Sequence, residues 1–130
     1  MIRAHAKAVL DLLAGTANLT AYDTQAPDKV APPFVVFRPD SGLRDRSSVL
    51  AASDRFTMTG TLTCVGVDRV QAQWVAEKAV GALLDARPTV AGRTSSPIEH
   101  LYSQQIQRDD DFTPPLFYAV ELVRFFTVPA

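Results

Sequence analysis

Two long stretches of the chain have the hydrophobic pattern of β-strands. From Arg55 to Gly66, apolar residues alternate with threonines, which is the period of a strand with one buried and one polar face. Gly60 interrupts the apolar face and predicts a bend, a bulge or the close approach of another backbone. From Pro114 to Val128, a run of roughly a dozen strand-forming residues predicts a long final strand, where five or six residues are usual. We expect this strand inside a sheet, because an exposed apolar edge would pair with other chains. The predicted buried face of the first strand consists of Phe56, Met58, Leu62 and Cys64.

Two further stretches repeat apolar residues at helical spacing. In residues 2–14 the charged side chains fall mostly on the opposite side, and Gly15 follows where a helix commonly ends. In residues 68–86, Asp68 stands at the N-cap position, small alanines form the apolar stripe, and Pro88 ends the helix. We therefore expect two helices that each pack one face on a sheet. The two stripes are Ile2, Ala6, Val9, Leu10 and Leu13, and Ala72, Val75, Ala79, Ala82, Leu83 and Ala86.

Shorter apolar runs complete the expected topology. Residues 19–22 and 34–38 predict two strands joined by a proline-bearing connection. Residues 98–107 predict a strand with a polar exposed face, and residues 109–111 turn the chain into the final strand. The order is helix, two strands, long loop, strand, helix, then two or three strands. It predicts one domain over residues 1–130 with an α+β fold, a largely antiparallel β-sheet covered on one face by two α-helices.

The composition excludes several classes of protein. Of the 130 residues, 47% are hydrophobic and 21% are charged, which argues against wholesale disorder. The formal net charge of −1 gives no global basic field that would attract nucleic acid or acidic membranes. No run approaches the roughly 18 apolar residues of a membrane span, and the N-terminus lacks the pattern of a signal peptide. Cys64 is the single cysteine, so no intrachain disulfide can form, and we expect a soluble protein made in a reducing compartment.

The segment from Asp40 to Asp54 predicts a long exposed loop, with at most a little strand at its tips. Loops of this length in a small domain are often functional or involved in assembly. It holds the one local basic group of the chain, Arg44 and Arg46, with Arg55 just after it. These charges are either a solvated surface balanced by neighbouring aspartates, including Asp45, or an ordering element for assembly. A third alternative is a contact with a passing phosphate backbone.

The sequence contains no recognisable catalytic or metal-binding constellation. His5, His100 and Cys64 are too few and too far apart for a zinc site, which needs three or four ligands at short spacings. We interpret both histidines as surface residues, His5 on the polar side of its helix, and Cys64 as a small buried hydrophobe. Glycine-rich phosphate loops and nucleophile motifs are also absent from the sequence. We therefore expect no enzymatic activity, no cofactor and no metal.

Two other features are candidates for assembly contacts. Asp109, Asp110 and Asp111 lack the spacing of a calcium loop, so they form either a solvated turn or an acidic patch that meets a basic patch on a neighbouring subunit. Trp74 lies off the alanine stripe of the second helix. It either caps the edge of the core, which we favour, or anchors an interface.

Several segments together resemble tail terminator (tail completion) proteins of long, non-contractile-tailed bacteriophages. They are the Ala-Tyr-Asp strand end at residues 21–23, Ala-Pro-Pro-Phe-Val-Val-Phe at residues 31–37, and the strand from Phe56 to Cys64 followed by an alanine-rich helix ending in Leu83-Leu84. The closing Pro-Leu-Phe-Tyr-Ala-Val-Glu-Leu-Val-Arg-Phe-Phe is also similar to the final strand of such proteins from phages of actinobacteria. Neighbouring families of head-tail connector and completion proteins share this size and order of elements.

The resemblance implies a structural virion protein assembled in the host cytoplasm. Such a protein forms a ring, usually of six subunits, that ends polymerisation of the tail tube and joins it to the head connector. Its partners would be copies of itself, the tail tube protein and the neck protein, with genomic DNA passing through the ring and no membrane contact. A ring of this kind needs two different complementary patches on each subunit. The alternatives are another neck component or a small α+β enzyme or ligand-binding module with a cleft between the second helix and the long loop.

Overall fold

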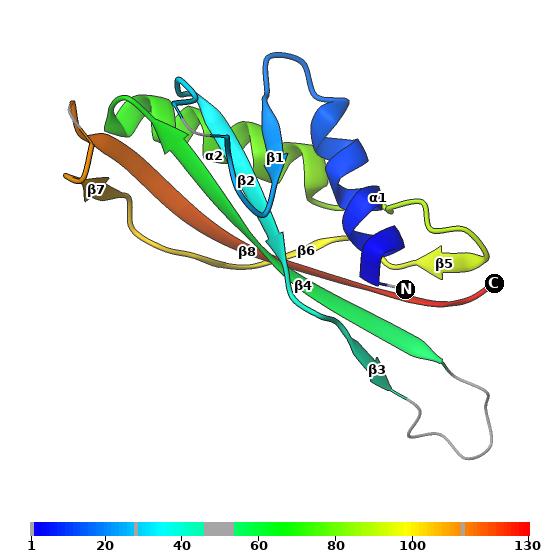
Figure 1. Cartoon of the computed structure of the whole chain (residues 1–130). Helices are drawn as coiled ribbons and strands as arrows, with labels where there is room; N and C mark the ends of the chain where they lie inside the picture. The colour runs from blue at the N-terminus through cyan, green and yellow to red at the C-terminus, as the bar shows by residue number, and fades with distance from the viewer. Residues whose placement is uncertain (1, 28, 46–53, 113) are drawn as a thin grey trace.

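The computed structural model describes residues 2–27, 29–45, 54–112 and 114–130. The central part of the predicted long loop, including Arg46, therefore lies outside the described residues. Within the described part, the chain forms the expected α+β fold, with two helices on one face of a largely antiparallel sheet (Figure 1). The elements in chain order are α1 (Ile2–Ala14), β1 (Ala21–Asp23), β2 (Phe34–Pro39), β3 (Leu43–Asp45), β4 (Arg55–Gly66), α2 (Arg69–Leu83), β5 (Arg93–Ser95), β6 (Glu99–Ser103), β7 (Gln107–Asp109) and β8 (Leu116–Pro129).

The centre of the sheet is an antiparallel pair of its two longest strands, β4 and β8. They pair from Phe56 opposite Thr127 to Gly66 opposite Phe117. On the far edge of β4 lie β2 and β3, with β1 added in parallel to β2. On the far edge of β8 lie the three short strands β5, β6 and β7. The final strand is thus paired on both sides, which confirms the prediction that it lies inside the sheet.

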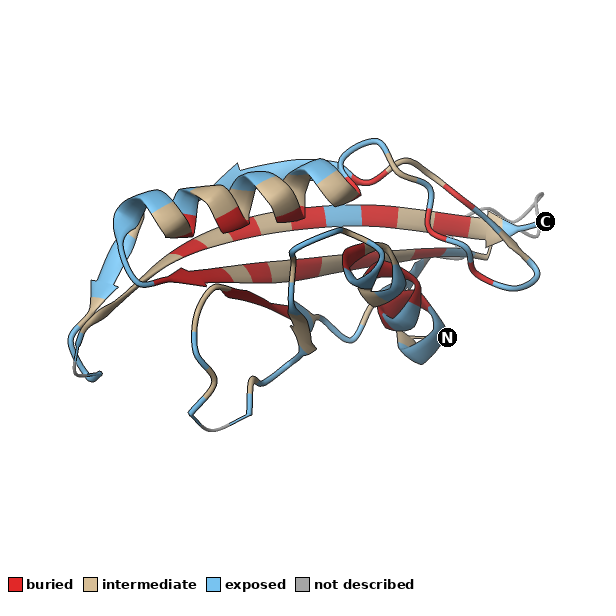
Figure 2. Ribbon diagram, turned by 90° about the horizontal axis from the view of Figure 1, so that it is seen from above, coloured by how far each residue is buried: buried red, intermediate tan, exposed pale blue. Residues whose placement is uncertain are grey.

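Burial alternates along β4 as the sequence pattern predicts. From Phe56 to Cys64 its apolar residues are buried in the main core, whereas its threonines are only half-buried (Figure 2); Val65, at the end of the strand, is buried on the opposite face. The alternation holds because neighbouring side chains of a strand point to opposite faces. We call the side packed under the helices the covered face and the opposite side the uncovered face. The half-buried threonines of β4 are Thr57, Thr59, Thr61 and Thr63.

Both helices have local reasons to begin and end where they do. The side chain of Asp68 accepts a hydrogen bond from the backbone N–H of Gln71 at 2.7 Å, which confirms the predicted N-cap of α2. The N–H of Gly15 donates to the carbonyl of Asp11 at 3.0 Å at the end of α1. The main core lies between the helices and the covered face. Its fully buried members include Val9, Leu13, Val35, Phe37, Leu62, Val75, Ala79 and Leu83.

Two expectations need correction in detail. The close approach at Gly60 comes from a side chain, because a Cβ there would lie 2.2 Å from the ring of Phe37. The strand predicted over residues 98–107 is divided into β6 and β7. Residues 104–106 separate the two strands, and Gln104 among them still donates its N–H to Val120 at 2.9 Å. A register irregularity between His100 and Tyr102 lies within β6 itself. Among the described residues, no helix is long and apolar enough to cross a membrane.

Candidate assembly interface

The strand β3 and the start of β4 form an arm at one end of the sheet. Asp45 pairs with Arg55 and Leu43 pairs with Thr57, so residues 43–45 and 55–57 constitute this arm. Figure 1 shows it at the opposite end of the sheet from β7. Part of the predicted loop is therefore a strand pair, as expected at its tips.

The turn into the arm is fixed by glycine and aspartate. Gly42 has a φ of +79°, and a Cβ there would overlap the ring of Phe56. The side chain of Asp40 accepts a hydrogen bond from the N–H of Gly42 at 2.9 Å. Only glycine fits this position without strain, so the direction in which the arm leaves the sheet is defined by local geometry.

An ion-pair cluster holds the root of the arm. Asp54 lies 2.9 Å from Arg44 of β3 and 3.5 Å from Arg93 of β5, measured between nitrogen and carboxylate oxygen. The guanidinium of Arg93 also donates to the carbonyls of Asp54 and Thr127, and its Nε donates to the Thr127 hydroxyl at 2.7 Å. Because the Arg93 side chain is only 8% exposed, these contacts are well shielded from water. Arg44, a predicted assembly residue, is thus partly engaged within its own chain.

His5 belongs to the same cluster, which contradicts its interpretation as a surface histidine. It is fully buried, its Nε2 lies 2.7 Å from the hydroxyl of Thr127, and its ring stacks near Phe56 and Phe125. The sequence contained the signal, since His5 precedes Val9 by four residues and so falls on the apolar stripe of α1. The cluster therefore joins α1, β5 and β8 to the root of the arm.

The uncovered side of the arm has an exposed apolar residue beside a cation. Leu43 is 69% exposed, and its cross-strand partner Thr57 places it on the uncovered face. Arg55 lies on the same face, with its guanidinium 3.8 Å from the ring centre of Phe126. In the backbone pairing Arg55 lies opposite Asp45. The arm thus presents an exposed apolar side chain beside a positive charge.

The other end of the uncovered face contains an apolar groove. One part of it has a volume of about 200 Å³ and is lined mainly by apolar side chains, with Thr63 and Asp109 as its polar members. The apolar residues are Phe34, Val65, Phe112, Leu116 and Tyr118. It continues past Val30 and Pro32 into an adjoining hollow of about 440 Å³. Phe112, which lines both parts, is 52% exposed. Phe34 and Val65 are themselves buried, as members of a second, smaller apolar cluster with Val36, so Phe112 is the exposed apolar side chain of the groove.

The predicted acidic cluster lies at the rim of this groove. Asp109 ends β7, and its carboxylate accepts the backbone N–H of Asp111 at 3.0 Å, which confirms the turn before β8. Asp110 pairs with Arg108 at 2.6 Å. Asp111 is exposed, and its carboxylate makes no contact with a cation among the described residues. We refer to residues 109–111 as the acidic turn.

Trp74 is the remaining predicted site residue, and the structure places it at the edge of the core. It is half-buried, packs against the main apolar cluster, and has Lys78 5.8 Å from its ring centre. The preferred expectation of core packing is confirmed. Trp74 is not brought together with the arm, the groove or the acidic turn.

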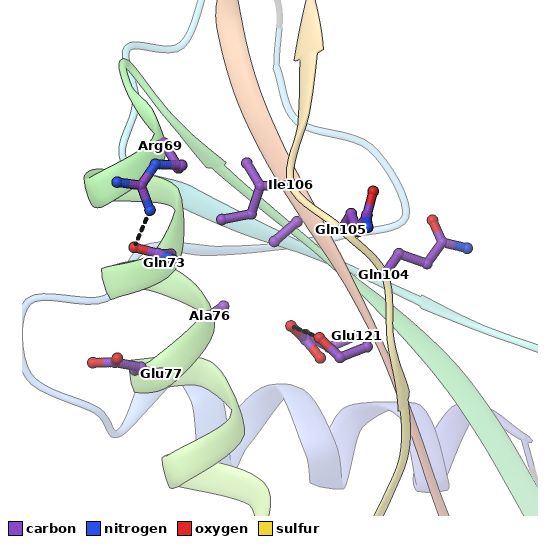
Figure 3. Close-up of a pocket in the computed structure, with 10 residues that line it drawn as sticks. Arg69, Gln73, Ala76, Glu77, Gln104, Gln105, Ile106 and Glu121 are labelled. Atoms are coloured by element: carbon purple, nitrogen blue, oxygen red, sulfur yellow. Dashed lines mark hydrogen bonds between the residues drawn. The ribbon is translucent and has the colours of Figure 1, made fainter.

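A polar groove between α2 and the segment connecting β6 and β7 is the best candidate for small-molecule chemistry (Figure 3). At its floor lies Glu121, which is only 5% exposed although it stands on the covered face opposite Leu62. One carboxylate oxygen lies 2.7 Å from Nε2 of His100, and the other accepts the hydroxyl of Ser103 at 2.8 Å. These bonds offset the cost of burying the carboxylate.

This trio does not have the arrangement of an activated nucleophile. In nucleophilic catalysis a base contacts the hydroxyl, and a third group orients the base. Here the hydroxyl of Ser103 and the ring of His100 both bind Glu121, so the carboxylate occupies the middle position. The observed effect of the trio is to attach β6 to β8. Sequence analysis missed Glu121, although its alternation with Ala119 and Val123 placed it on the buried face.

Cys64 lies deep in the core beside this region. Burial, with a smaller contribution from the charge of Glu121, raises the pKa of its thiol to about 12. The thiol therefore stays protonated at neutral pH, the opposite of what a nucleophilic cysteine requires. Within the described ranges, no three histidine, cysteine, aspartate or glutamate residues are grouped closely enough to hold a metal ion.

Some solved structures have a fold similar to that of this chain. The chain aligns with a chain of the virion of a native gene transfer agent particle, with a TM-score of 0.69 and 15% identity over 96% of this chain and 94% of that one. This fold occurs in a virion. A second solved structure, of a protein without a descriptive name, aligns with a TM-score of 0.54 and 14% identity over 98% of this chain and 92% of that one. At these identities the likeness establishes a shared fold. The sequence matches no family model and no curated protein.

Proposed function

We propose that this protein is a structural component of a phage-like virion, specifically a tail terminator. In this role, copies of the chain form a ring that caps the tail tube, stops its polymerisation and joins it to the neck. The observation that carries the proposal is the likeness, over nearly the whole chain, to a chain of a gene transfer agent virion. The sequence resemblance to tail terminators supports the more specific role, at the end of the tail tube.

The surface of the fold supports a role in assembly. A heterologous ring needs two different patches on each subunit, and the arm and the apolar groove are two such patches at opposite ends of the sheet. The short outer strands β5, β6 and β7 also leave backbone groups at the edge of the sheet, where a neighbouring chain can bind. Both features favour contacts with other protein chains.

The polar groove at Glu121 gives less support to an enzymatic or ligand-binding role. It is an open groove between α2 and residues 103–106, rather than a cleft between α2 and the long loop. Cys64, whose pKa is strongly raised, is buried and does not line it. A catalytic site combines a pocket with a perturbed titrating group that faces it, and these two features are separate here.

Deletion of the gene tests the tail-terminator role against the rival neck role. Loss of a terminator leaves tube growth unchecked, so electron micrographs of the mutant particles should show overlong tails detached from heads. Loss of a neck component would instead leave tails of normal length beside unjoined heads. Normal infectious particles lacking this chain would contradict both roles.

A further inference from the structure

We propose that the apolar groove is the docking site for the arm of a second copy of this chain. Leu43 of one copy enters the groove formed by Phe34, Phe112 and Leu116 of its neighbour, and Arg55 of the arm faces the acidic turn at the groove's rim. The inference deepens the proposed ring by naming the contact at each subunit boundary, and it rests on that proposed function.

The two surfaces cannot meet within one chain. Thr57, the partner of Leu43, and Val65, which lines the groove, are eight residues apart on the single strand β4. At about 3.3 Å per residue this separates them by about 26 Å. Since β4 is paired with β8 along this whole length, it cannot fold back to bring the two together. A Leu43 side chain that occupies the groove must therefore come from another copy of the chain.

The two surfaces match in polarity. Leu43 is 69% exposed, and the groove around Phe112 is a mainly apolar hollow on the same face. Transfer of a leucine side chain from water to an apolar site is favourable. A hollow of about 200 Å³ has room for one such side chain. Removing both apolar surfaces from water at once gives this contact its driving force.

The two surfaces also match in charge. Arg55 stands beside Leu43 on the arm. Asp111 stands beside Phe112 at the groove and has no cation in contact among the described residues. The arm thus places a positive charge, and the groove a negative charge, next to an exposed apolar side chain. Complementary charges of this kind fix the register of an apolar contact and disfavour like ends meeting.

The positions of the arm and the groove on the twisted sheet determine the geometry of a contact between two copies. The arm and the groove are different surfaces, so the contact is heterologous, and a contact of this type generates a ring when its repeated rotation closes. Figure 1 shows β8 face-on at its start and edge-on toward its end, so the sheet twists along its length. The uncovered face at the arm is therefore turned relative to the uncovered face at the groove. This turn allows the arm of one copy to lie over the groove of the next.

Cysteine crosslinking in purified particles tests the contact. The variant Leu43→Cys/Phe112→Cys should give, after mild oxidation, a ladder of disulfide-linked oligomers on a non-reducing gel. Each single variant should give none, and Leu84→Cys/Phe112→Cys is the matched control, because Leu84 is 46% exposed at the end of α2 and outside both surfaces. The native Cys64 does not interfere, since it is buried.

Charge exchange in purified protein gives an independent readout. Arg55→Glu and Asp111→Arg should each raise the concentration for half-assembly by roughly tenfold, the scale of one lost charge contact. The double variant Arg55→Glu/Asp111→Arg should restore assembly. If either residue had only a structural role, the two losses of assembly would instead add.

The outcomes separate this inference from the proposed function. Particles that contain the chain but give no ladder with the double-cysteine variant would overturn the arm-in-groove contact and leave the structural role intact. Dimers formed by Phe112→Cys alone would show that two grooves face each other, and would also overturn it. Absence of the chain from particles would overturn both the contact and the proposed function.

Discussion

The two faces of the β4–β8 pair have opposite chemistry, although they belong to the same two strands. On the covered face, Met58 and Phe125 are buried under the helices, and the polar residues found there are held in specific hydrogen bonds. On the uncovered face, threonines and apolar residues such as Leu122 remain half-buried without a helix above them. The covered face therefore holds the main core, whereas the uncovered face is buried only at one end, around Phe34, Val36 and Val65.

Adjacent residues on β8 provide the largest expected contrast. Phe125→Asp should abolish folding, because the carboxylate would be buried without a partner where Phe125 is only 3% exposed. Phe126→Asp, one residue further on the uncovered face, should leave a folded protein. Circular dichroism and thermal melting of the two variants measure the difference. A folded Phe125→Asp variant with the melting temperature of the wild type would show that the two faces have been assigned incorrectly.

Two isosteric threonine variants test the buried hydrogen bonds. Thr127→Val should lower the free energy of unfolding by about 1–3 kcal/mol, because it removes the hydroxyl that both His5 and Arg93 contact. Thr61→Val, on the uncovered face, should change that free energy by less than about 0.5 kcal/mol. Urea denaturation measures both values. Equal losses would mean that the cluster at the arm root contributes nothing specific to stability.

Two cysteines on opposite faces should differ in reactivity. Cys64 should resist alkylation in the folded protein at neutral pH, whereas the neighbouring variant Thr63→Cys should react at its own thiol. Mass spectrometry after brief iodoacetamide treatment distinguishes the two sites. Rapid labelling of Cys64 in the native protein would contradict its burial.

The thiol of Cys64 also predicts how stability depends on pH. Its pKa is raised from 9.0 to about 12 in the folded state, so the folded protein holds its proton more tightly. This contribution to stability is fully present below pH 9 and is lost as the pH rises toward 12. The variant Cys64→Ala should lose that pH dependence in denaturation curves measured between pH 8 and 12.

The smallest effect on folding is expected at the arm. Arg44→Glu should change the stability of the isolated subunit by about 1 kcal/mol or less, because Arg44 is 41% exposed and its pair with Asp54 is partly screened. Assembly of the subunit should be impaired more than its folding. Lys7→Glu, which breaks an exposed ion pair on α1, is the control for charge reversal away from the arm. A loss of thermal stability as large as the loss of assembly would refute this expectation.

The long helices and strands could be predicted because the periodicity of each one appears within a single run of consecutive residues. The predicted bounds of β4 agree with the structure, and the N-cap at Asp68 was correctly placed. The division between β6 and β7 was missed because it depends on where pairing with β8, a strand distant in the sequence, is interrupted. The candidate assembly surfaces could be predicted only in part. The arm root depends on contacts among residues such as His5, Arg93 and Thr127, which are far apart in the chain.

The groove was not predicted because its walls come from four separate segments. Phe34 is in β2, Val65 ends β4, Phe112 follows the acidic turn, and Leu116 begins β8. No local spacing connects these positions, and each one alone has the appearance of an ordinary core residue. The acidic turn was recognised as a possible partner for a basic patch, and the structure adds the apolar surface beside it.

Electron cryo-microscopy of purified particles tests the proposed ring most directly. We expect density at the end of the tail tube nearest the head into which copies of this fold fit as a closed ring, with the covered helices intact in every copy. A reconstruction in which the ring at that position has a different fold, and in which this chain occurs nowhere in the particle, would contradict the central claim that the protein acts by assembling with copies of itself.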